Sequence, residues 1–161
     1  LESVAKQAGV SKGGLLYLFP SKDDLLQGLV GRLLEKGAGR RKALREDAPD
    51  DPEICLRASI EACLLSEDRN PQLGVAIIAA LTQSPKLMDA IRAHTAERFR
   101  ELDGLPMRKD EAALVLLAID GLMLMEILNV SPFSDSERRT LIETMMDAAH
   151  RLAAEGAATT T

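Results

Sequence analysis

Residues 9–26 read GVSKGGLLYLFPSKDDLL and predict two helix starts within one short segment. Ser11 and Ser21 are suited to cap helices, because a serine oxygen accepts a hydrogen bond from a free backbone N–H of the first turn. Pro20 ends the helix that Ser11 begins, and Gly9 has the freedom to take the positive φ that a tight turn before Ser11 needs. The segment therefore predicts two short helices joined by a turn and followed at once by a third helix.

The whole chain of 161 residues has an aliphatic composition that favours packed helices. Hydrophobic residues make up 46%, yet there are only one Tyr, three Phe and no Trp, whereas sheets favour β-branched and aromatic residues. Further cap signals stand at Asp51-Pro52, Asn70-Pro71, Ser84-Pro85 and the box-like 134–137. We therefore expect an all-α fold, with helices over residues 1–8, 12–19, 22–45, 52–67, 71–82, 85–102, 109–129 and 135–155.

The formal net charge of −5 hides an asymmetry between the two ends of the chain. Residues 1–47 contain nine Lys/Arg against six Asp/Glu, and the rest contain eleven against nineteen, giving +3 in front and −8 behind. The front is thus compatible with binding a polyanion, and the back is not. Two solvated faces would explain the charge equally well.

A helix-turn-helix unit explains the first two predicted helices. In such units the start of the second helix meets base edges and phosphates, and here it holds Lys12, Gly13 and Gly14. A small residue is needed where the helices cross, Ala5 or Ala8, with apolar anchors at Val4, Val10, Leu15 and Phe19. Lys22 and nearby backbone N–H groups at the next helix start are suited to grip the DNA backbone. A plain pair of helices remains the alternative.

Residues 4–22, VAKQAGVSKGGLLYLFPSK, resemble the DNA-binding signature of the tetracycline-repressor (TetR) family. The resemblance implies a DNA-binding domain with a connecting helix over 1–45 and a helical ligand-binding and dimerisation domain over 46–161. It implies a ligand-responsive, DNA-binding transcriptional regulator, a homodimeric repressor that a small molecule releases from its double-stranded operator. The DNA contacts that it implies are Ser11, Lys12, Gly13, Gly14, Tyr17, Leu18 and Lys22, with Lys12 best placed to reach a base.

The chain departs from this family signature at three positions. The family usually has Thr at Gly14, Tyr at Leu16 and often His at Leu18, whereas this chain resembles the Gly-Gly-Leu-Leu-Tyr variant of the signature, with its aromatic hydroxyl at Tyr17. A hydroxyl that contacts phosphate is therefore lost at Gly14; Tyr17 either replaces it or is a half-buried aromatic, and Leu18 either touches a thymine methyl or packs inward. The family also places a helix before residues 1–8, and the chain begins at Leu1, so we expect native residues upstream.

Candidates for a ligand pocket lie in the larger domain. They are Cys63, His94, Phe99, Asp120 and Met123, and each has ordinary packing as its alternative. Asp120 stands in an apolar helix, where a carboxylate needs a partner from a neighbouring helix or at a dimer seam. The cysteines and histidines lack the close spacing of metal ligands, so we expect neither a metal nor another cofactor.

The last two predicted helices suit a dimer interface. Residues 112–128 are apolar nearly all round, which predicts burial on several sides, and the helix after Ser134 has a stripe of Leu, Met and Ala. Closure of a monomeric bundle is the alternative for both.

Other classes of function find less support in the sequence. No catalytic grouping or phosphate loop is present, so we do not expect an enzyme. The longest apolar stretch is interrupted by Asp120 and Glu126, which argues against a membrane span, and the two cysteines form no C-x-x-C pair, which fits the cytoplasm. A helical ligand- or partner-binding protein with a vestigial DNA-binding unit remains the alternative function.

Overall fold

A computed structural model describes residues 1–48, 51–65, 74–75, 77–78, 81 and 85–159, and all regular structure within these residues is helical. The helices are α1 (Glu2–Gln7), α2 (Lys12–Leu18), α3 (Lys22–Glu46), α4 (Ile54–Leu64), α6 (Pro85–Arg100), α7 (Lys109–Ile127) and α8 (Asp135–Thr159). None of the described helices is both long and apolar enough to cross a bilayer. The all-α expectation is confirmed.

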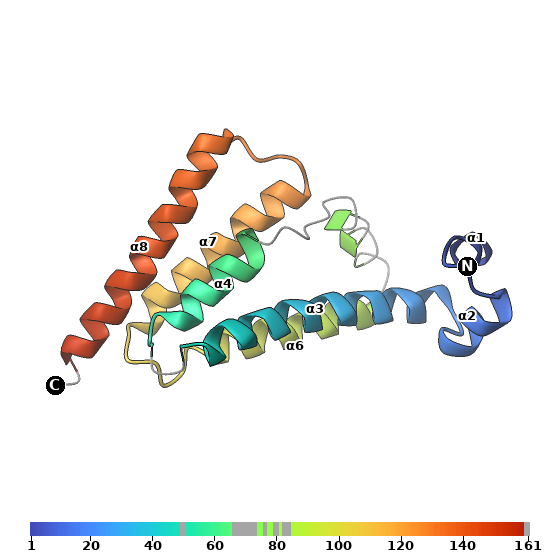
Figure 1. Ribbon diagram of the computed structural model, residues 1–161, viewed down its shortest axis with the longest axis horizontal. Helices are drawn as coiled ribbons and strands as arrows, with labels where there is room; N and C mark the ends of the chain where they lie inside the picture. The colour runs from blue at the N-terminus through green and yellow to red at the C-terminus, as the bar shows by residue number, and fades with distance from the viewer. Residues whose placement is uncertain (49–50, 66–73, 76, 79–80, 82–84, 160–161) are drawn as a thin grey trace.

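The long helix α3 separates two parts of the molecule (Figure 1). Its 25 residues give a rod of about 37 Å. Helices α1 and α2 lie at its N-terminal end, whereas α4, α7 and α8 lie towards its other end, and α6 runs along it. The first two helices are therefore held away from the larger bundle by α3.

Two apolar cores hold the larger bundle together. The main core joins α4, α7 and α8, and its fully buried side chains include Leu56, Ile60, Leu116, Ile119 and Leu152. The second core lies between α3 and α6, with Val30 and Leu87 at its centre. Helix α3 packs on both α4 and α6, so the rod that supports α1 and α2 is in contact with two helices of the larger bundle.

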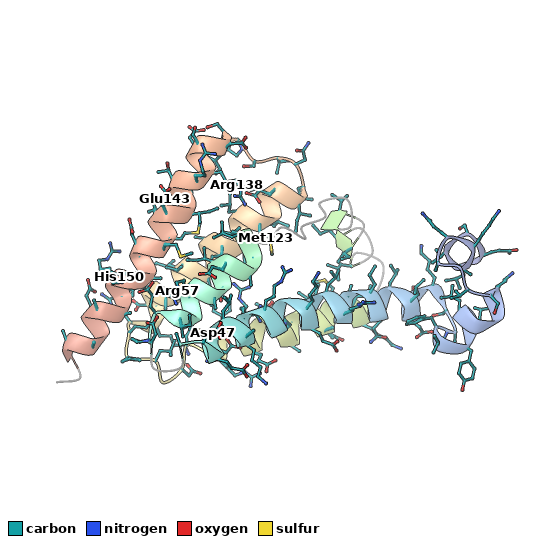
Figure 2. All side chains as sticks on the ribbon, viewed as in Figure 1. Asp47, Arg57, Met123, Arg138, Glu143 and His150 are labelled. Carbon is teal, nitrogen blue, oxygen red and sulfur yellow. The ribbon has the colours of Figure 1, made fainter. Side chains whose placement is uncertain are left out.

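Arg138, at the start of α8, forms hydrogen bonds that link α8 to α7 and α4 (Figure 2). Its Nε donates to Glu126 Oε1 of α7 at 2.6 Å, and its Nη2 donates to the carbonyl of Leu64 at the end of α4 at 2.8 Å. Hydrogen bonds to charged groups stabilise more than neutral ones, so this contact fixes the top of α8 against its neighbours.

The cap signals locate most helix starts, with one correction. Ser21 and Ser134 each form the expected box with an acid three residues on. The helix expected at 52, however, begins at Ile54, because the Asp51 carboxylate accepts the N–H of Glu53 at 2.9 Å and closes a turn first. In the helix expected over 71–82, residues 74–75, 77–78 and 81 are helical; Asn70, Pro71 and Ser84 lie outside the described residues.

Helix α7 differs from its sequence expectation in burial. Its face towards α4 and α8 is buried, with Ala112 and Ile119 fully enclosed. Its other face leaves Leu114 64% and Leu117 56% exposed. The expectation of burial on several sides is therefore wrong within one chain, because α4 and α8 cover only one side of the helix.

Candidate nucleic-acid interface

The turn between α1 and α2 is closed by two backbone hydrogen bonds. Gly9 has φ of +68°, its N–H donates to the Lys6 carbonyl at 3.3 Å, and the Val10 N–H donates to the Ala5 carbonyl at 3.0 Å. This Schellman arrangement satisfies the last carbonyls of α1 and needs a residue that tolerates positive φ. The expected role of Gly9 is confirmed.

The contact between α1 and α2 is smaller than expected. Ala5 is 2% and Leu15 7% exposed, so these two residues form the crossing. Val4 and Val10 were also expected to be buried anchors, but they are 43% and 49% exposed. That expectation is wrong in this chain, because α1 has only six residues and Ala5 is its one buried residue, whereas Val10 lies in the turn after α1.

Ser11 caps α2 and keeps the first turn of this helix open to solvent. Its Oγ accepts the N–H of Gly14 at 3.0 Å, as the sequence predicts. A Cβ at Gly14 would lie 3.1 Å from that oxygen, so glycine gives the cap room that a larger residue would take. Lys12 and Gly13 are exposed beside it. The helix therefore presents its positive end, with one cation, on the surface.

Lys12 has a counter-ion that the sequence did not reveal. Its Nζ lies 3.1 Å from Glu2 Oε2, and the two side chains are 57% and 79% exposed. Exposed pairs of this kind contribute about 0–1 kcal/mol and are screened by salt, so a phosphate competes readily for the same ammonium group. Ten residues separate the two side chains, and only the turn at Gly9 brings them together.

Tyr17 and Leu18 both point away from the protein. Tyr17 is 87% and Leu18 69% exposed, which rules out a half-buried Tyr17 and an inward-packed Leu18. Tyr17 lies three and four residues after Gly14 and Gly13, so it shares their face of α2. An apolar side chain and a phenol on one open helix face are suited to contact thymine methyl groups and phosphate oxygens.

The start of α3 offers DNA a lysine side chain. Asp24 Oδ2 accepts the backbone N–H of Ser21 at 3.0 Å, and Ser21 Oγ accepts the N–H of Asp24 at 3.1 Å. This capping box occupies two of the free donors at the helix start, and Asp23 adds a further negative charge there. The exposed ammonium group of Lys22 is thus the positive charge of this turn.

A close contact between Phe19 and Gly28 fastens α2 to α3. A Cβ at Gly28 would lie 2.7 Å from Phe19 Cε1, so the ring rests against the bare helix backbone. Glycine in a helix interior costs about 0.5–1 kcal/mol relative to alanine, and here it permits the aromatic contact. Sequence reasoning assigned Phe19 to the contact with α1 and missed Gly28.

The five candidates for a ligand pocket fall into two groups. Cys63, Phe99 and Met123 are partly buried against the main core. Asp120 accepts a hydrogen bond from Arg98 Nη1 of α6 at 2.7 Å, so its partner comes from a neighbouring helix. His94 lies one turn before Arg98, and its pKa is below the usual value because of burial and the positive charges of Arg41 and Arg98.

The described part of the chain contains no cluster of side chains that could bind a metal ion. No three His, Cys, Asp or Glu side chains are grouped there so as to hold an ion. Cys55 and Cys63 are not joined in a disulfide, and burial raises the pKa of Cys55. The thiol of Cys55 therefore stays protonated within the core.

Comparison with known proteins accounts for both parts of the fold. Residues 1–29 match the model described as bacterial regulatory proteins, tetR family, and residues 53–150 match the tetracyclin repressor-like C-terminal domain. The HTH-type transcriptional regulator RutR of Escherichia coli K12 is 35% identical over 92 residues, or 56% of this chain and 42% of RutR. The HTH-type transcriptional regulator EthR of Mycolicibacterium smegmatis is 29% identical over 89 residues, or 55% of this chain and 41% of EthR. The matched region thus spans less than half the length of these relatives, and the two family models together cover most of the described helices. The chain belongs to the tetracycline-repressor (TetR) family.

Proposed function

We propose that this chain acts as a ligand-responsive transcriptional regulator that binds operator DNA as a homodimer through residues 11–22. The observation that carries the proposal is the exposure of all the expected DNA contacts on α2 and at the start of α3, namely Ser11, Lys12, Gly13, Gly14, Tyr17, Leu18 and Lys22. Membership of a family of regulators and two relatives described as HTH-type transcriptional regulators support it. We infer repression, a cytoplasmic location and no enzymatic activity on the same grounds.

A dimer through α7 and α8 is supported by an exposed apolar stripe on α7. The α7 stripe comprises Leu114, Leu117, Gly121, Leu124 and the C-cap residue Leu128, which recur every three or four residues and therefore share one helix face. The four leucines are 42–64% exposed, and a Cβ at Gly121 would meet nothing within 4 Å. A central glycine allows a second copy of α7 to approach closely, and burial of the leucines would stabilise the pair.

Helix α3 is the element that would couple ligand to DNA. One end holds α2 through the contact between Phe19 and Gly28, and the remainder packs on α6 and α4. A ligand that favours one position of α6 or α4 relative to α3 also favours one position of α2. In a dimer this would set the separation of the two copies of α2, and a ligand that favours a separation unsuited to the operator would release the DNA.

Selection of duplex DNA from a random pool, followed by lysine substitution, tests the proposal. Lys12→Ala should relax base preference at one or two positions of the selected site. Lys22→Ala should weaken binding to all sequences alike and reduce the slope of log K against log salt by about one. Lys86→Ala, at an exposed position of α6, is the matched control and should change neither.

The contrary outcomes are equally specific. Equal effects of Lys12→Ala and Lys22→Ala on all sequences would contradict this division of roles. If the dimer binds no duplex DNA even at low salt, the result would favour the alternative function, a ligand- or partner-binding protein with a vestigial DNA-binding unit.

A further inference from the structure

Arg98 of α6 is buried with part of its hydrogen-bonding capacity unused. It is 6% exposed, and its Nη1 donates to Asp120 Oδ1 at 2.7 Å. Its Nε and Nη2 are buried, and neither has an acceptor among the residues that the structure describes. Leaving the buried donors of a charged group unsatisfied costs free energy, so these two nitrogens require an acceptor.

The two unused donors lie on the same edge of the guanidinium group. Nε–H and one N–H of Nη2 point in parallel from that edge, at the spacing of the two oxygens of a carboxylate. Asp120 is bound at Nη1, so it leaves both nitrogens of this buried edge without an acceptor. Arginine binds planar anions in two-point fashion through such an edge, which a lysine cannot do.

The surroundings of this edge are electropositive. Arg41 of α3 is 5% exposed, and its Nε also has no acceptor in the described chain. Arg41 and Arg98 are both near enough to His94 to lower its pKa and near enough to Cys55 of α4 to act on its thiol. Arg45, one turn after Arg41, is already neutralised by Glu101 at 2.9 Å. Asp120 offsets part of the charge at Arg98, and Glu97 also acts on His94, but more weakly than either arginine.

We propose that the free edge of Arg98 binds the carboxylate of a small organic acid between α3, α6 and α7, with Arg41 supplying a second positive charge. This inference rests on the proposed function, because it names the chemical class of the effector. Two of the three helices that would meet the ligand are α3 and α6, which pack on each other, and α2 lies at the N-terminal end of α3. A bound carboxylate would therefore act directly on the rod that supports the DNA-binding unit.

The test uses the DNA-free protein and two acids with matched neutral controls. Hexanoate and benzoate are the probes, and hexanamide and benzamide have nearly the same shapes without the charge. The side-chain Nε–H signal of Arg98, assigned by its loss in Arg98→Lys, is followed by nitrogen-15 NMR while thermal melting is recorded. We expect at least one acid to move this signal and raise the Tm, and its amide to do neither.

Substitution of Arg98 distinguishes the contribution of its two-point binding edge from that of its positive charge. Arg98→Lys keeps a cation for Asp120 but lacks the two-point edge, and should weaken binding of the acid at least about tenfold. Arg100→Lys, the same change at an exposed position of α6, should leave binding unchanged. An Arg98 signal that neither acid moves, an equal response to the amide, or undiminished binding by Arg98→Lys would overturn the inference. Because no readout involves DNA, binding of the acid by a protein that ignores duplex DNA would refute only the proposed function.

Discussion

Leu117→Ala should weaken the dimer while sparing the fold of the single chain. Complete burial of a leucine stabilises by about 1.5–3 kcal/mol, and Leu117 is 56% exposed in one chain. Covering that remainder contributes about 1–1.5 kcal/mol per copy, and two-fold symmetry doubles it to about 2–3 kcal/mol. The dimer dissociation constant should therefore rise roughly 30–150-fold.

Sedimentation equilibrium over a dilution series measures this constant directly. The control is Leu18→Ala, because Leu18 is 69% exposed on α2 and should affect DNA binding without affecting dimerisation. An unchanged dissociation constant for Leu117→Ala, or an equal rise for Leu18→Ala, would refute the assignment of the α7 stripe to the dimer interface.

Three further substitutions test how the fold and the site are held. Gly156→Ala should lower the free energy of unfolding, measured in urea, by about 1–3 kcal/mol, because the added Cβ would overlap the backbone of the loop between α6 and α7. Gly39→Ala is the control, because a Cβ there has no atom within 4 Å and should not destabilise the fold. Gly28→Ala should weaken DNA binding measured by fluorescence anisotropy, because it displaces the ring that fastens α2, with little change in the melting of the larger bundle. His94→Gln should flatten the pH dependence of stability. The pKa of His94 is lowered in the folded chain, so the unfolded chain binds the proton more readily, and the wild type should lose stability as the pH falls through about 6.5.

Each of these expectations has a clear contrary result. Equal urea midpoints for Gly156→Ala and Gly39→Ala would mean that the loop yields without cost. Unchanged DNA affinity in Gly28→Ala would show that α2 does not depend on this contact. If the wild type and His94→Gln lose stability in parallel between about pH 7.5 and 5.5, His94 is not the group responsible.

Short-range signals account for the parts of the fold that the sequence predicted well. The caps at Ser11 and Ser21 and the positive φ of Gly9 depend on hydrogen bonds that span three to five residues. The same holds for the start of α8 at Asp135. Helix α4 begins at Ile54, two residues after the expected start, because Asp51 first closes a turn by accepting the N–H of Glu53. An Asp-Pro pair is compatible both with such a turn and with a helix start, so the sequence does not distinguish them.

Contacts between distant segments could not be read in this way. Periodicity indicated an apolar α7 but not which side α4 and α8 would cover, so the burial of α7 was overestimated. Nothing in the sequence marks Arg41 and Arg98 as buried among the many exposed arginines. Their burial depends on where α3, α6 and α7 cross, and Asp120 alone hinted at a charged partner.

For the candidate DNA surface, the resemblance to the TetR signature named the expected contacts, and the structure leaves all of them exposed, because they belong to one short segment with its own caps. Packing between helices decided three other features. These are the pairing of Lys12 with Glu2, the contact of Phe19 with Gly28 and the buried, unpaired edge of Arg98. Local hydrogen bonds are encoded by neighbours in the chain, whereas these contacts join residues whose distance is set by how whole helices pack.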